Sequence, residues 1–129
     1  MHRLRVCFFL LLVSSLTLSC GTSSGRHLQS ISISQNVVGQ QIQFVATGTY
    51  SAQPTTVSPL PADWMLGIPA PPPPQWTYSL STQPYAYDCS NTNPVNPGAV
   101  TAIAPTDPNA PASGTTAKVV TGSVAFSCQ

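Results

Sequence analysis

The stretch QIQFVATGTY, residues Gln41–Tyr50, alternates between two sets of side chains over its whole length. Ile42, Phe44 and Ala46 fall on one face, while Gln43 and its alternate neighbours fall on the other. A period of two residues is typical of a β-strand with one buried face. We therefore expect a strand here and take it as the centre of an all-β fold.

Similar patterns lie on both sides of this strand. Upstream, residues 28–34 alternate Ile31 and Ile33 with serines, and a turn is expected at residues 38–40. In the last expected strand, at residues 118–128, the alternation of apolar and polar side chains breaks at Gly122, which indicates a bulge or bend. Loops are expected at residues 51–61, 68–75, 90–97 and 105–115, and further strands at residues 63–67, 76–81, 85–89, 98–104 and 118–128.

No segment keeps a helical period. About seven short strands separated by turn signals in about 100 residues predict an antiparallel β-sandwich.

The first residues form a separate unit. Arg3 and Arg5 precede an apolar run at residues 6–13, and small residues lead to Cys20. This order is typical of a secretory signal, and the run is shorter than the roughly 20 apolar residues that span a bilayer. We expect a cleaved signal at residues 1–19, a flexible tether at 20–27 and one domain at 28–129.

The end of the signal, LTLSC at residues 16–20, resembles the lipobox of bacterial lipoprotein precursors. The resemblance implies that Cys20 becomes the first mature residue and carries the acyl chains that anchor the protein to a membrane. Gly21 after it, rather than Asp, implies the outer membrane in a Gram-negative bacterium. The alternative is an ordinary signal peptide cut near Ser19, which leaves Cys20 as a free thiol.

The remaining cysteines indicate a disulfide. Cys7 leaves with the signal and Cys20 takes the lipid, so Cys89 and Cys128 remain. In an oxidising compartment such a pair is expected to be joined. We expect no metal and no cofactor, since the only His of the mature part, His27, lies in the tether.

Charge and chemistry exclude several classes of function. The mature part carries Arg26 and Lys118 against three Asp and no Glu, which is too little positive charge for nucleic-acid binding. Catalysis needs a base beside a nucleophile or paired carboxylates. His27 would have to fold back from the tether to meet an Asp, so we expect no enzyme.

Aromatic side chains are the sharpest candidates for binding. Trp64, Trp76 and Tyr78 are expected to fill the core of a small sandwich, while Tyr85 and Tyr87 are expected to be the exposed pair. Because exposed aromatic faces bind sugar rings or apolar partners, Tyr85, Tyr87 and Trp76 are the candidate binding residues.

Several segments resemble a bacterial immunoglobulin-like domain of group 2: LQSISIS at residues 28–34, QFVATGTYS at 43–51, Trp64, and GSVAF at 122–126. The resemblance implies a β-sandwich of the kind found in adhesins and surface proteins. The hypothesis is a lipid-anchored adhesion or interaction module of the bacterial cell envelope, with an envelope protein or polysaccharide as partner. A passive spacer is the alternative, and a carbohydrate-binding accessory or small hydrolase is less favoured.

Overall fold

The computed structural model describes residues 25–68, 74–90 and 98–129. Within these residues it is all-β, with antiparallel pairing and no helix. The strands are β1 (Leu28–Val38), β2 (Gln41–Tyr50), β3 (Thr56–Val57), β4 (Asp63–Leu66), β5 (Trp76–Ser79), β6 (Tyr85–Asp88), β7 (Gly98–Pro105), β8 (Ser113–Thr116) and β9 (Val119–Phe126). The expected signal and Cys20 lie outside the described residues, as do most of the 90–97 loop and residues 69–73 of the loop expected at 68–75, which include three of the four consecutive prolines at 71–74.

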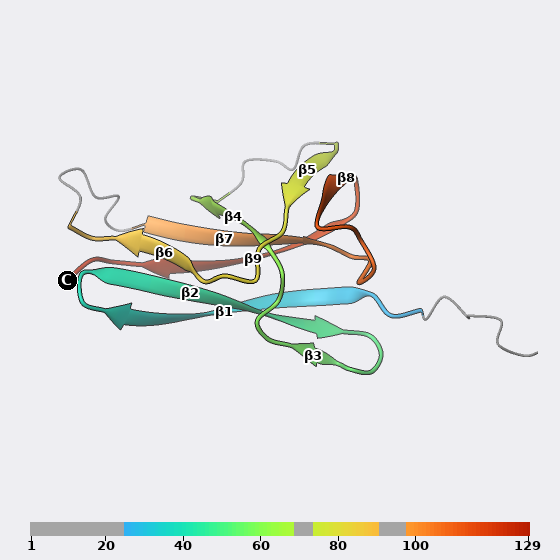
Figure 1. Ribbon diagram of the computed structural model, residues 1–129, viewed down its shortest axis with the longest axis horizontal. Helices are drawn as coiled ribbons and strands as arrows, with labels where there is room; N and C mark the ends of the chain where they lie inside the picture. Colours follow the sequence, from blue (N-terminus) through green and yellow to red (C-terminus); the bar gives the residue numbers. More distant parts are fainter. Residues whose placement is uncertain (1–24, 69–73, 91–97) are drawn as a thin grey trace, which may run out of the picture.

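The strands form three sheets (Figure 1). In the first, β2 pairs with β1 on one side and with both β3 and β6 on the other. In the second, β7 lies between β4 and β9. The third is the pair β5–β8, which projects from one end of the molecule.

The central strand has the bounds that its alternation predicts. Ile42, Phe44, Ala46 and Tyr50 are all buried. Strand β1 continues to Val38, beyond the expected end, because it pairs with β2 up to the contact Val38↔Gln41. Gly39 then turns the chain with φ of 61°, a conformation that glycine adopts without steric cost.

Side chains from β2 and β7 meet in two apolar clusters, and Ile33 and Trp64 pack against both of them. The first cluster contains Leu28, Ala46, Leu60, Ala102 and Ala104. The second cluster contains Ile42, Phe44, Val100 and Phe126.

The bulge expected at Gly122 is wrong. Strand β9 pairs with β7 in continuous register through Ala102↔Gly122. The glycine is instead required by space, because an added Cβ would overlap the Ile31 carbonyl oxygen and lie 2.9 Å from the Cβ of Ile31. Strands β1 and β9 therefore cross at a distance that leaves no room for a side chain.

The loop expected at residues 105–115 contains a strand at its end. Strand β8 has small polar residues with no apolar alternation, so its own sequence does not indicate a strand. It forms because it pairs with β5, where Tyr78 lies opposite Gly114 and is buried. Strand β5 ends at Ser79, two residues earlier than expected.

A buried hydroxyl and a disulfide brace the second sheet. Thr101 is fully buried, and its Oγ1 donates to the Gly67 carbonyl oxygen at 2.8 Å and lies 2.6 Å from Ser123 Oγ. The predicted disulfide is confirmed: Cys89 after β6 is bonded to Cys128 after β9, with an S–S distance of 2.03 Å. The end of the chain is thereby fixed to the first sheet.

Candidate functional site: the two ends of the domain

The aromatic pair expected to be exposed is half-buried, so that prediction is wrong. Tyr85 stacks on Trp64, with ring centroids 5.8 Å apart and planes inclined by 20°. Tyr87 packs on Phe126 with centroids 4.8 Å apart. Strands β6 and β4 are edge strands of different sheets, and their rings pack against the apolar core that the two sheets share.

Trp76 and Trp64 are also half-buried. Their indole Nε1 atoms are buried and have no hydrogen-bond partner among the residues that the structure describes. Tyr78 is buried, but beneath β8 rather than between the larger sheets. Among the described aromatic side chains, Trp64, Trp76, Tyr85 and Tyr87 are half-buried and the others are buried.

The chain enters the domain at Gly25, at the end opposite the β1–β2 turn and the carboxyl end of the chain (Figure 1). We call the region of Arg26, His27, Asp107 and Lys118 the tether end. We call Val37, Val38, Gly39 and Gln40 the distal tip.

The distal tip exposes apolar side chains. Val37 is 69% exposed and Val38 is 49% exposed. Leu66 and Ile68, at the end of β4 that lies toward the same side of the molecule, are 39% and 72% exposed. Beside the tip, a hollow of about 410 Å³ is bordered by the disulfide and by glutamine side chains. Every large apolar side chain that is exposed in the described residues thus lies away from the tether.

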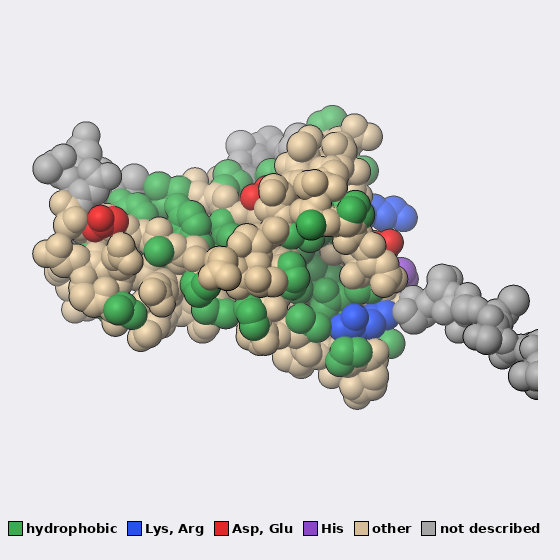
Figure 2. Space-filling model, in the orientation of Figure 1, with side chains coloured by type: hydrophobic (Ala, Val, Ile, Leu, Met, Phe, Trp, Pro, Cys, Tyr) green, Lys and Arg blue, Asp and Glu red, His purple; other side chains and the backbone are tan. Residues whose placement is uncertain are grey.

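The tether end has a larger hollow, of about 610 Å³ (Figure 2). Apolar residues such as Leu60, Leu80 and Ala104 form much of its lining, and Arg26 and Asp107 contribute charged groups. Such a mixture of apolar lining and few polar groups is general for ligand sites.

Arg26 is held in place at this end. Its Nη2 and Nε donate to the Pro54 carbonyl oxygen at 2.7 and 3.1 Å, and Nε also lies 3.3 Å from the Ala52 carbonyl oxygen. The guanidinium carbon lies 3.8 Å from the centre of the Tyr50 ring. Burial raises the pKa of the Tyr50 hydroxyl, and the charge of Arg26 partly opposes this effect.

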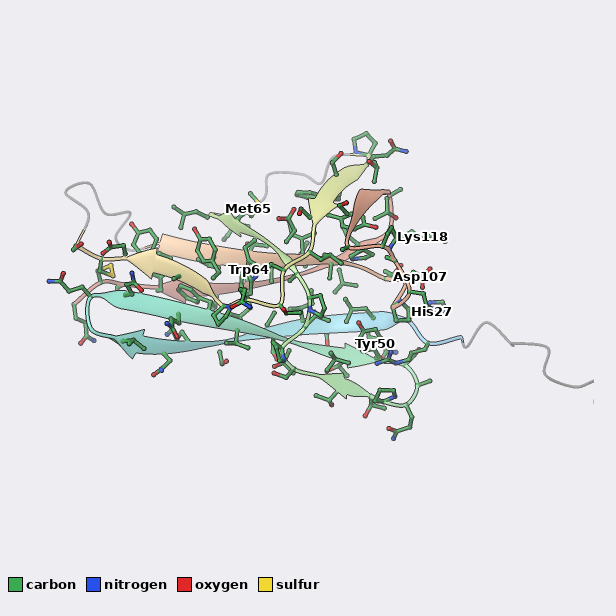
Figure 3. The ribbon with its side chains drawn as sticks, viewed as in Figure 1. His27, Tyr50, Trp64, Met65, Asp107 and Lys118 are labelled. Atoms are coloured by element: carbon green, nitrogen blue, oxygen red, sulfur yellow. A yellow bond between two sulfur atoms is a disulfide. The ribbon has the colours of Figure 1, made fainter. Side chains whose placement is uncertain are left out.

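His27 and Asp107 both line a second hollow of about 650 Å³, together with Lys118 (Figure 3). Within the described ranges, no hydrogen bond joins the imidazole to Asp107 or to a hydroxyl group. The nearby Ser51 Oγ is already engaged, since it accepts from the His27 amide at 2.9 Å and donates to the Gly25 carbonyl oxygen at 3.1 Å. Ser51, His27 and Asp107 are therefore not joined by the hydrogen bonds that couple nucleophile, base and carboxylate in a hydrolase.

Charge is distributed unevenly along the domain. The cationic side chains of the described chain, Arg26 and Lys118, and the titratable His27 all lie at the tether end (Figures 2 and 3). Of the aspartates, Asp107 lies there, whereas Asp88 lies toward the distal tip. Ser90 donates to Asp88 through its hydroxyl and its amide, which lowers the pKa of that carboxyl.

No protein-family model matches the chain, and neither a curated protein nor a solved structure matches it. In residues 25–68, 74–90 and 98–129, no three His, Cys, Asp or Glu side chains gather as metal ligands. The same residues contain no helix long and apolar enough to cross a bilayer.

Proposed function

We propose that this protein is a lipid-anchored, non-enzymatic interaction module of the bacterial cell envelope, with an immunoglobulin-like sandwich as its scaffold. The strand order supports the scaffold. Strands β1, β2 and β6 form one sheet and β4, β7 and β9 another, as strands A, B, E and C, F, G do in immunoglobulin domains. The disulfide departs from antibody domains because it follows β6 and β9 rather than joining the two sheets' central strands.

The observation that carries the interaction role is the apolar distal tip. Val37 and Val38 are exposed on a hairpin at the end opposite the tether. An anchor at Cys20 would hold the tether end near the bilayer and direct this tip outward. Exposed apolar side chains gathered on one part of a surface mark a site of association.

The chemistry of the tip favours a protein partner over a polysaccharide. Aliphatic side chains gain free energy when they are buried against another apolar surface. Sugar recognition by stacking needs open aromatic faces, and the rings of Trp64, Tyr85 and Tyr87 pack against other side chains.

A passive spacer is the second candidate. It is favoured by the half-burial of Tyr85, Tyr87 and Trp76, the residues expected to bind. A spacer would need only the fold, the disulfide and the anchor.

Site-specific photo-crosslinking in living bacteria separates the two candidates. A photoreactive amino acid is placed at Val37 and, as the matched control, at exposed Thr115 on β8. An interaction module gives a discrete covalent adduct from position 37 that the control does not give. Equal labelling from both positions, or none, contradicts the interaction role and leaves the spacer.

The anchor is tested by the intact mass of the protein extracted from membranes, and by Cys20→Ser. Lipidation predicts a mass that starts at Cys20 with added acyl chains, and release of the variant from the membrane fraction. A lipid-free mass would contradict the anchor.

A further inference from the structure

We infer that the tether end is a docking surface for anionic phospholipid headgroups, so that the domain stands on the bilayer with its distal tip outward. The inference deepens the proposed function and rests on the proposed lipid anchor. Its basis is the position of the charges relative to the tether.

The cations of the tether end are not neutralised by an ion pair within the part of the chain that the structure describes. Among the described residues, Arg26 and Lys118 form no ion pair with an aspartate. Arg26 is fixed by carbonyl oxygens and by the Tyr50 ring, all of which are neutral, so its full positive charge remains. Lys118 is exposed on the chain that leads into β9.

The same end is the one that an anchor would hold at the membrane. Four residues lie between Cys20 and Gly25, so the five steps from one Cα atom to the next span about 17 Å when fully extended. Gly25, Arg26 and Lys118 border one hollow, so both cations lie near the point where the chain enters. A tether of this length allows both cations to come within about a Debye length, roughly 10 Å, of the lipid surface.

A weak electrostatic attraction to the lipid surface is sufficient to orient a domain that is already tethered to it. One Lys or Arg near an anionic surface contributes about 1 kcal/mol, or about a fivefold change in an equilibrium. Two such charges would not recruit a free protein. On a tethered domain, however, docking is intramolecular and the effective concentration is high. The attraction then decides between docked and undocked orientations rather than between bound and free protein.

Asp107 supplies an internal test, because its charge has the opposite sign at the same end. Its Oδ1 accepts from the Asn109 amide, and an amide oxygen at position 107 can accept the same bond. Asp107→Asn should therefore favour docking, whereas Lys118→Gln should oppose it. Asp88→Asn is the matched control, since it removes the charge of an aspartate that pairs with Gln41, beside the distal tip.

The experiment uses the full lipidated protein in vesicles of phosphatidylcholine, with or without phosphatidylglycerol. A donor dye is attached at Asn109 near the tether end, or at Gln40 in the distal tip, in protein with its disulfide intact. Energy transfer to an acceptor on the lipid headgroups reports how close each end lies to the bilayer.

Docking predicts that transfer from position 109 rises when phosphatidylglycerol is added and falls again with salt, while transfer from position 40 stays low. Lys118→Gln should lower the ratio of docked to undocked protein about fivefold. Asp107→Asn should raise it, Lys118→Arg should restore it, and Asp88→Asn should leave it unchanged.

Two results overturn the inference, and they are distinguishable. Protein that stays with the vesicles but shows the same transfer in both lipids, or the same transfer in Lys118→Gln, is anchored but does not dock. Protein that does not stay with the vesicles has no anchor, which overturns the proposed function and the docking with it.

Discussion

Replacing Gly122 with alanine tests how the two larger sheets meet. Gly122 lies in the middle of β9, where the backbone of β1 crosses it at Ile31. The substitution adds one methyl group. That group would overlap the Ile31 carbonyl oxygen and lie 2.9 Å from both the carbonyl carbon and the Cβ of Ile31. These are backbone-fixed atoms, so they cannot rotate away.

The expected loss of stability depends on which atoms the added methyl group would meet. Overpacking a well-packed interior costs about 1–3 kcal/mol, and a clash with backbone belongs at the upper end, near 3 kcal/mol. Alanine also restricts the unfolded chain, which returns about 0.5 kcal/mol. We expect Gly122→Ala to lower the free energy of unfolding by about 2.5 kcal/mol and the melting temperature by on the order of 10–20 °C.

Gly48→Ala is the matched control. Its added Cβ would lie 2.9 Å from the Cδ1 atoms of Leu28 and Leu60, which are ends of flexible side chains. We expect a loss of about 1 kcal/mol or less, since these tips can shift. Both variants are compared by guanidinium unfolding followed by circular dichroism. A Gly122→Ala protein as stable as the parent, or no less stable than Gly48→Ala, would refute the close crossing of β1 and β9.

The other predictions concern the bonds that brace the fold and one titrating group. Replacing both Cys89 and Cys128 with serine should lower the free energy of unfolding measured in urea by about 4 kcal/mol, because the disulfide closes a loop over a sequence separation of 39. A loss below about 1 kcal/mol would contradict a structural role for the bond. Thr101→Val should cost about 0.5–1.5 kcal/mol in the same assay, since it removes the hydrogen bonds of the buried Thr101 hydroxyl to Gly67 and Ser123. Unchanged stability would contradict a structural role for these bonds. The Tyr50 pKa is raised by burial, so the folded state favours the neutral phenol. This preference stabilises the folded state fully below the unfolded-state pKa near 10, and the stabilisation is lost as the pH rises through the folded-state pKa. Tyr50→Phe should abolish that loss of stability at alkaline pH. Arg26→Gln should raise the Tyr50 pKa further, as measured by ultraviolet titration.

The alternation of apolar and polar residues predicts the bounds of a strand well where one face of that strand is buried. Strand β2 has the expected bounds because its alternation is continuous from Gln41 to Tyr50. Strand β8 was not expected because Ser113–Thr116 has no apolar side chain, and its strand conformation comes from pairing with β5. The disulfide was predictable by elimination from the number of cysteines.

Features that depend on contacts between distant segments could not be predicted. The alternation break at Gly122 was visible, but its cause is the backbone at Ile31, about 90 positions earlier in the chain. Tyr85 and Tyr87 alternate as a half-exposed strand would. Their half-burial follows from β6 lying at an open edge beside Trp64, which pattern alone does not reveal. The segregation of cations and exposed aliphatic side chains to opposite ends likewise needs the topology.

The antiparallel pairing of β1 with β2 also determines how the domain would carry a mechanical load. The hydrogen bonds between them run across the strands, from Val38↔Gln41 at the distal tip to Leu28↔Tyr50 beside the tether. A pull on the tether that is opposed by a partner on the tip would act along β1, so the covalent backbone of β1 would carry the load and the hydrogen bonds to β2 would be spared. The Cys89–Cys128 bond would prevent the opposite end of the chain from peeling away. Force along the long axis would thus be carried by covalent bonds rather than by the hydrogen bonds of the sheet.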